Sequence, residues 1–177
     1  MKLGRRLVLG GMAAPVAAVV AGCGFRPVYM PSAGGQPGVA QRELAAIYVN
    51  LIPDRPGQLL RQALQQRFVG AGDSAKPLYN LNVVYWVSGE GIGVQPDNTT
   101  TRIRMFGNAN WALVGRDPAQ TRITDGSSRA EDAVNLINEQ YFAADLQTEA
   151  AYRYLAEALA DQITTRLATF FRTKANG

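Results

Sequence analysis

Two long segments in the middle of the sequence alternate between apolar and polar residues, and this alternation limits the fold more than any other feature. In residues 78–87 the apolar members are Leu81, Val83, Tyr85 and Val87. In residues 99–114 they are Ile103, Met105, Ala109, Trp111 and Leu113. A period of two puts successive side chains on opposite faces of a β-strand, so both segments are predicted strands with one apolar face. The glycine-rich stretch 89–98 between them predicts a hairpin turn.

Helical spacing appears on both sides of this hairpin. Apolar residues recur every three or four positions between 145 and 171, at Tyr152, Leu155, Leu159, Ile163, Leu167 and Phe170. A shorter stripe formed by Leu60, Leu64 and Phe68 predicts a helix ending near position 69. Asp54 is its predicted N-cap, and Pro56 suits its first turn.

Two further strands complete the predicted order of elements. Residues 44–52 are rich in branched and aromatic side chains, and residues 121–138 form a weaker, more polar strand. The order is then β-α-β-β-β-α. Strands with one polar face need cover on one side only. The sequence therefore predicts an α+β fold: a two-layer sandwich with a four-stranded mixed sheet covered on one face by two helices.

The N-terminus has the organisation of a secretory signal. Residues 1–6 carry three positive charges, residues 7–21 carry none, and small residues lead up to Cys23. The apolar stretch is too short to span a bilayer, which needs about 20 residues. A cysteine directly after the predicted cleavage site is the lipobox pattern of bacterial lipoproteins. The predicted organisation is a signal peptide over 1–22, a lipidated tether over 23–41 and a single domain over 42–177.

The sulfur of Cys23 is the predicted site of lipid attachment, because the lipobox cysteine receives a diacylglycerol on its thiol. Each buried CH₂ contributes roughly 0.8 kcal/mol, so two or three acyl chains anchor a protein almost permanently. Gly24 follows the cysteine, and the absence of an aspartate there favours export to the outer membrane. The alternative is an ordinary secretory signal beside an incidental cysteine.

The composition excludes several kinds of chemistry. The chain has no histidine and one cysteine, which rules out His-dependent catalytic triads, the usual zinc and iron sites, and an intrachain disulfide. Removing the signal leaves 15 of 18 basic residues against 14 acidic ones, so nucleic-acid binding gains no support from charge. Carboxylate-only catalysis stays open. Its candidates are Glu90, Asp97, Asp117, Asp125, Glu131 and Asp132, for which solvated loop charges are the simpler interpretation.

The polar face of the predicted hairpin is the candidate contact surface. Its polar members are Asn80, Asn82, Arg102, Arg104, Asn108 and Asn110. Two neighbouring guanidinium groups can hold phosphate through charge-assisted hydrogen bonds. Val84, Trp86 and Phe106 alternate with these residues and would add apolar surface suited to a partner or an amphiphile. The alternative is an ordinary solvated sheet face.

Several motifs together resemble the LptE-type family of lipopolysaccharide-assembly lipoproteins, in its alphaproteobacterial form. They are Gly22-Cys23-Gly24-Phe25-Arg26-Pro27-Val28-Tyr29, then Ile52-Pro53-Asp54-Arg55 leading into Gln58-Leu59-Leu60-Arg61-Gln62-Ala63-Leu64. The order of elements and the long final helix are also similar. The resemblance implies a non-enzymatic protein without cofactor at the inner leaflet of the outer membrane. It also implies that the protein plugs the LptD β-barrel translocon and binds lipopolysaccharide.

One feature departs from the family pattern. Family members carry basic residues near the tip between the second and third strands, where they contact the anionic groups of the lipid. Here the tip reads Gln95-Pro96-Asp97-Asn98, without a base. Arg102 and Arg104 could have taken over the role, or direct lipid binding could be weaker. An auxiliary lipoprotein of a lipid-transport ABC system is the alternative function, and it would require an apolar groove.

Overall fold

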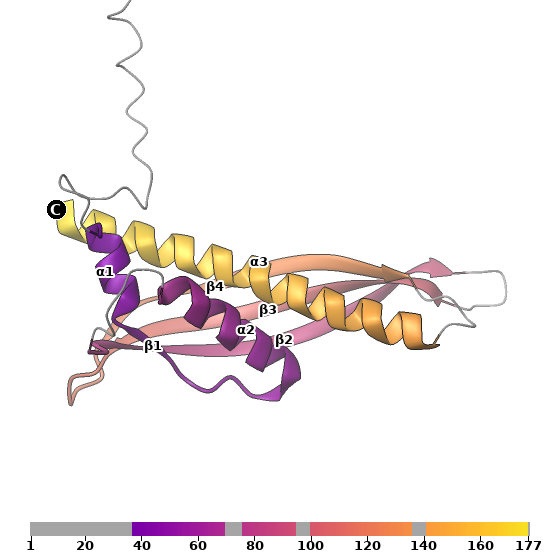
Figure 1. Cartoon of the computed structure of the whole chain (residues 1–177), viewed down its shortest axis with the longest axis horizontal. Helices are drawn as coiled ribbons and strands as arrows, with labels where there is room; N and C mark the ends of the chain where they lie inside the picture. Colours follow the sequence, from indigo (N-terminus) through magenta and orange to yellow (C-terminus); the bar gives the residue numbers. More distant parts are fainter. Residues whose placement is uncertain (1–36, 70–75, 95–99, 136–140, 177) are drawn as a thin grey trace, which may run out of the picture.

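The computed structural model describes residues 37–69, 76–94, 100–135 and 141–176. The elements are α1 (Val39–Ala45), β1 (Ile47–Val49), α2 (Asp54–Phe68), β2 (Tyr79–Val94), β3 (Thr100–Gly115), β4 (Arg122–Asn135) and α3 (Tyr141–Asn176). Figure 1 shows the strands side by side, with α3 running along most of their length. The N-terminal signal, Cys23, most of the tether and the tip at 95–98 lie outside the described residues.

The sheet is mixed and its strands follow chain order. β1 pairs with β2 in parallel, whereas β2–β3 and β3–β4 are antiparallel. Helices α2 and α3 lie on the same face of this sheet (Figure 1). The predicted α+β two-layer architecture with a four-stranded mixed sheet is therefore confirmed, and α1 adds a third helix.

The core lies between the helices and the apolar face that the alternation predicted. Leu81 and Leu113 are fully buried on the strands, opposite Leu155, Leu159 and other apolar residues of α3. Burying one such leucine stabilises the fold by roughly 1.5–3 kcal/mol. On the helix layer, ion pairs Arg55–Glu149 (2.6 Å) and Arg67–Asp161 (2.5 Å) link α2 to α3.

Gly107 lets α3 approach the sheet closely. A Cβ at this position would lie 3.1 Å from Cδ1 of Leu159 and 3.3 Å from Cβ of Leu155. These distances are tighter than ordinary contact, so the missing side chain makes room for the two leucines. A larger residue at position 107 would therefore strain the contact between α3 and the sheet.

The prediction of a strand over 44–52 was wrong at both ends. Leu44 belongs to α1, where it is buried together with Ala40 one helical turn earlier, and β1 is limited to residues 47–49. After β1 the chain leaves the sheet, and Leu51 is 77% exposed. A short apolar run fits a strand or a buried helix equally well, because periodicity cannot separate the two over so few residues.

Other predicted boundaries also moved. β2 continues through the glycine cluster to Val94 with register shifts after Gly91, so that cluster is an irregular strand end and not a bend. Helix α3 begins four residues before Asp145 and ends five residues after Phe171. Asp54 makes no side-chain capping hydrogen bond and adopts a left-handed φ of 66°, a conformation that aspartate tolerates better than most residues.

Tyr85 places an unpartnered hydroxyl in the core, beside Ala109 and under α3. Burial, with a smaller contribution from Tyr152, raises its pKa from 10.0 to about 12. Tyr79 also has a pKa of about 12, first through burial and then through the hydrogen bond that its hydroxyl donates to Glu43 (2.7 Å). Both pKa values are higher in the folded chain than the ordinary value of 10.0. The contribution of these tyrosines to the free energy of unfolding is therefore complete below pH 10 and is lost as pH rises through about 12.

We expect Tyr85→Phe to leave the free energy of unfolding at pH 7 unchanged or slightly higher, because it removes a buried hydroxyl that has no partner. Tyr79→Phe should lower it by about 0.5–1.5 kcal/mol through loss of the bond to Glu43. Each variant should lose less stability than the parent between pH 10 and 12. Urea unfolding at pH 7 and pH 11 measures both effects; a Tyr85→Phe chain as alkali-sensitive as the parent would contradict the assignment.

Candidate functional site

The sheet face opposite the helices is uncovered, and we call it the open face. All six polar residues predicted on this face lie there, because their neighbours in each strand point into the core. Arg102, Arg104, Asn82 and Asn110 are exposed, whereas Asn80 and Asn108 are half-buried. Val84 is 66% exposed and Trp86 is 47% exposed between them. The predicted mixture of amides, guanidinium groups and apolar side chains is therefore present on one surface.

The strand register separates these residues into three groups. Asn80 and Asn82 lie opposite Val114 and Ala112, near the start of β2. Asn108 and Asn110 lie opposite Trp86 and Val84 in the middle of the sheet. Arg102 and Arg104 lie further along β3, and the eight-position separation of Asn110 and Arg102 spans roughly 27 Å. No small ligand could contact all three groups at once, so a long or branched partner would be needed to use the whole face.

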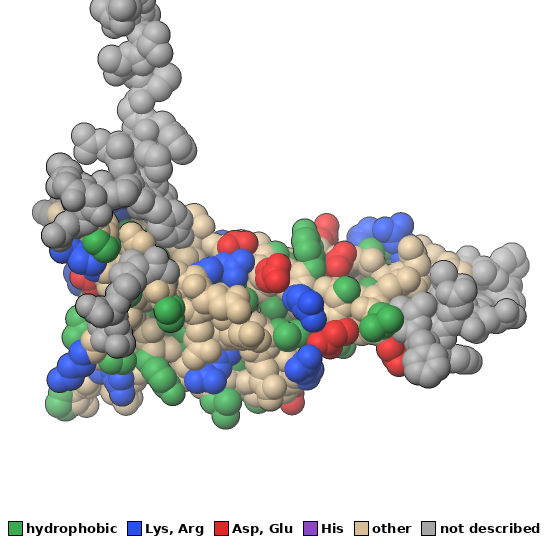
Figure 2. Space-filling model, in the orientation of Figure 1, with side chains coloured by type: hydrophobic (Ala, Val, Ile, Leu, Met, Phe, Trp, Pro, Cys, Tyr) green, Lys and Arg blue, Asp and Glu red, His purple; other side chains and the backbone are tan. Residues whose placement is uncertain are grey.

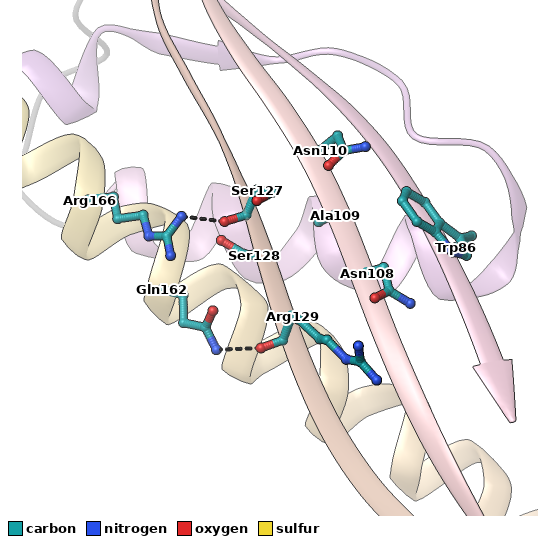
Figure 3. A pocket seen from close by; sticks show the side chains of 9 residues that line it. All are labelled: Trp86, Asn108, Ala109, Asn110, Ser127, Ser128, Arg129, Gln162 and Arg166. Atoms are coloured by element: carbon teal, nitrogen blue, oxygen red, sulfur yellow. Dashed lines mark hydrogen bonds between the residues drawn. The ribbon is translucent and has the colours of Figure 1, made fainter. Parts of the chain in front are cut away.

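The middle group borders a hollow at the β4 side of the open face. The hollow measures about 510 Å³ and is lined by Trp86, Asn108 and Asn110, with Ser127 and Arg129 of β4 beside them (Figure 3). The guanidinium of Arg129 stacks 4.2 Å above the ring of Phe106. An exposed indole flanked by amides and a guanidinium offers both apolar contact and hydrogen-bond donors.

Two side chains of α3 close the far side of this hollow. Gln162 donates a hydrogen bond to the carbonyl oxygen of Arg129 (3.0 Å), and Arg166 donates to the carbonyl oxygen of Ser127 (Figure 3). These carbonyls lie on the outer edge of β4, the end strand of the four-stranded sheet in the described part of the chain. An unpaired edge invites pairing with another chain, so the two side chains protect the edge while bordering the hollow. Neither residue was predicted from the sequence to border the contact surface.

The arginine group lies among acidic residues. Arg102 and Arg104 share a hollow of about 320 Å³ with Glu131 and Asp132, and Glu90 is the strand partner of Arg104. Neither arginine forms an ion pair with another described residue. Their donors are therefore open to an anionic ligand, but the neighbouring carboxylates reduce the positive potential there.

The remaining group, Asn80 and Asn82 near the start of β2, is partly engaged in contacts within the domain. The side-chain amide of Asn50 donates to Oδ1 of Asn82 at 2.5 Å, which joins the residue after β1 to β2. Arg116 lies 5.7 Å from the ring centre of Tyr48, the strand partner of Asn80. The first contact occupies the acceptor oxygen of Asn82 and leaves its NH₂ group available as a donor.

Two kinds of feature are absent from the described parts of the chain. Within residues 37–69, 76–94, 100–135 and 141–176, no three His, Cys, Asp or Glu residues are grouped so as to hold a metal ion. No helix in the same ranges combines the length and apolarity needed to cross a bilayer.

Comparison with known families decides what kind of protein carries this face. The sequence matches the LptE family, described as lipopolysaccharide-assembly, over residues 44–167. The chain belongs to the LptE family. The match covers well over half of the chain, from the end of α1 to the last turns of α3. It confirms the resemblance seen in the sequence motifs and places the protein among lipopolysaccharide-assembly lipoproteins. No curated protein matches the sequence.

Solved structures show that the fold recurs in other lipoproteins. A predicted lipoprotein of Caulobacter crescentus superposes with a TM-score of 0.61 at 20% identity, covering 77% of this chain and 98% of the other. Rare lipoprotein B of Shewanella oneidensis gives a TM-score of 0.52 at 13% identity, covering 73% and 95%. Lipoprotein B of Nitrosomonas europaea gives 0.52 at 11%, covering 70% and 81%. At these identities the similarity establishes the fold alone.

Proposed function

We propose that this LptE-family chain is an outer-membrane lipoprotein, attached through Cys23, that binds an LptD-type β-barrel translocon and plugs its lumen. In this role it aids the insertion of lipopolysaccharide into the outer leaflet and catalyses no reaction. The observation that carries the proposal is the open face: an elongated, largely polar surface on a domain whose core is already complete. A plug must be stable by itself and polar where it meets a hydrated lumen, and the amide-rich face meets both requirements.

The middle of the open face is the proposed centre of contact with the barrel or with lipopolysaccharide. Trp86 supplies a half-exposed aromatic surface, and tryptophan is among the residues that contribute most at protein interfaces. Asn108, Asn110 and Arg129 supply donors around it. Arg102 and Arg104 are the proposed contacts for anionic groups of the lipid, because they lack ion-pair partners among the described residues.

The experiment is an affinity pull-down of the tagged mature chain from detergent-solubilised envelopes. We expect a large outer-membrane β-barrel to be recovered in about equal amount. Asn110→Glu should reduce that recovery at least about tenfold, because it buries an unpaired charge at the contact. Gln66→Glu adds the same charge to an exposed position of α2 and should have no effect. Recovery of an inner-membrane ABC complex, or equal loss with both variants, would contradict the proposal.

A further inference from the structure

Basic residues gather at one end of the domain, which we call the basal end. It consists of α1, the start of β2, the turn between β3 and β4, and the end of α3. These segments meet there, because the N–H of Leu78 donates to the carbonyl of Ala46 (2.9 Å) and the N–H of Arg116 donates to Leu78 (3.0 Å). The bases are Arg42, Lys76, Arg116, Arg122, Arg172 and Lys174. Figures 1 and 2 show α1 and the C-terminus at this end, with basic side chains clustered around them.

The acids of the basal end are already engaged. Glu43 accepts the hydroxyl of Tyr79 at 2.7 Å. Asp117 accepts both the backbone N–H (3.4 Å) and the hydroxyl (3.1 Å) of Thr121 within its own turn. Asp125 pairs with Arg122 at 3.2 Å. Glu43 and Asp117 keep their negative charges because these donors are neutral, so six bases and three acids leave a net charge of about +3 at the basal end.

Three basal bases are exposed and unneutralised. Arg42, Lys76 and Lys174 make no ion pair with any residue that the structure describes. The opposite end of the domain carries the exposed acids Glu90, Glu131 and Asp145 together with the exposed bases Arg102 and Arg104, so its net charge is slightly negative. The molecule therefore has an electrostatic asymmetry along its length, which would turn the basal end toward an anionic surface.

Apolar side chains are interspersed with these bases. Leu78 is 53% exposed and Val39 is 39% exposed, although both lie beside well-packed elements. A hollow of about 610 Å³ at this end is lined by Lys76, Pro77, Leu78, Arg116 and Asp117. Bases combined with shallow apolar groups are typical of surfaces that rest on lipid headgroups.

We propose that the basal end docks on anionic phospholipid headgroups. The placement rests on the proposed anchor, since the described chain enters the domain at this end, 14 positions after Cys23. Those 14 positions span at most about 50 Å, so the basal end is the part of the domain held nearest the acylated residue. Docking there would keep the domain upright beside the membrane and leave the open face accessible to the barrel.

The test uses the mature chain, residues 23–177, carrying Cys23→Ala so that no acyl chain contributes. It is mixed with vesicles of phosphatidylcholine alone and with vesicles of equal parts phosphatidylcholine and phosphatidylglycerol, and bound protein is measured by sedimentation. We expect binding to the phosphatidylglycerol vesicles only, weakened by added salt. Replacing Arg42, Lys76 and Lys174 with glutamine should lower the partition constant about 100-fold, from about fivefold per base.

A matched control changes net charge equally without touching the basal end. Gln58, Gln62 and Gln66 are exposed on α2, and their replacement by glutamate should leave vesicle binding nearly unchanged. Equal loss in the two triple variants, binding to phosphatidylcholine alone, or binding to lipopolysaccharide aggregates in place of phospholipid would overturn the proposal. The basal variant should still recover the barrel in the pull-down. The two experiments therefore separate failure of this docking from failure of the proposed function.

Discussion

Leu159→Ala is expected to lower the free energy of unfolding by about 3–5 kcal/mol, in the upper part of the range for leucine truncation in a core. Leu159 is fully buried, and one of its methyl groups faces the position where Gly107 has no side chain. The cavity left by the substitution borders the backbone of Gly107 and the ring of Tyr85, whose Cε2 lies 3.3 Å from the Gly107 Cβ position, so the loss depends on how far these groups can close it. Urea unfolding measures the change. Leu146→Ala on the same helix should change stability by less than about 0.5 kcal/mol, because Leu146 is 74% exposed.

A substitution at Gly107 tests the same contact from the sheet side. Gly107→Ala in the parent should destabilise the fold by about 1–3 kcal/mol, because the new methyl group meets Leu155 and Leu159 within 3.3 Å. In the Leu159→Ala background the same methyl group enters the cavity, so the double variant should be more stable than the sum of the single changes predicts. Strict additivity in this double-mutant cycle would mean that the two positions do not contact each other.

The long strands could be predicted from sequence because their pattern is local and strong. Leu81 and Val83 on β2, with Trp111 and Leu113 on β3, were assigned to the covered face by alternation alone, and all four are buried. The predicted first strand was longer than β1, because three residues are too few to show a period of two. Its pairing with β2 is also parallel, so it depends on residues that are about 30 positions away in the chain.

The face to which these residues point could be predicted from the sequence. Which of them lie next to one another on the open face could not. Trp86 lies opposite Asn108 only because of the β2–β3 register, and a shift of one residue would turn one strand's side chains over. Gln162 and Arg166 were missed for a different reason. Polar residues on the outer face of an amphipathic helix look the same in sequence whether they meet water or cap a strand edge, as they do here.

The fold adds no support for catalysis by the carboxylate candidates. Glu131 and Asp132 border one hollow with Arg102 and Arg104, but the carboxylate of Asp132 accepts the backbone N–H of Ala133 (2.8 Å) in its own strand. Asp117 and Asp125 are held by Thr121 and Arg122 within short range. Glycoside cleavage needs two carboxyl groups converging on one bond, and these local contacts work against that geometry.

Cys23→Ala should abolish palmitate labelling and release from the membrane fraction the protein that is not bound to the barrel. The thiol is the predicted acceptor of the lipid, and no other cysteine in the chain could replace it. At roughly 0.8 kcal/mol for each buried CH₂, loss of two or three acyl chains removes far more membrane affinity than headgroup contacts supply. Metabolic labelling followed by fractionation measures both outcomes.

Gly24→Ala is the matched control for that experiment, because it changes the next residue but leaves the sulfur in place. It should retain both the label and the membrane fraction. The residual binding of the Cys23→Ala chain is informative as well. If the basal end contacts anionic headgroups, the part of this fraction that is not bound to the barrel should be small and removed by salt, whereas acylated protein stays bound. Label retained in Cys23→Ala, or an intact leader in the mass of the native protein, would show that the chain is not held by lipid at this position.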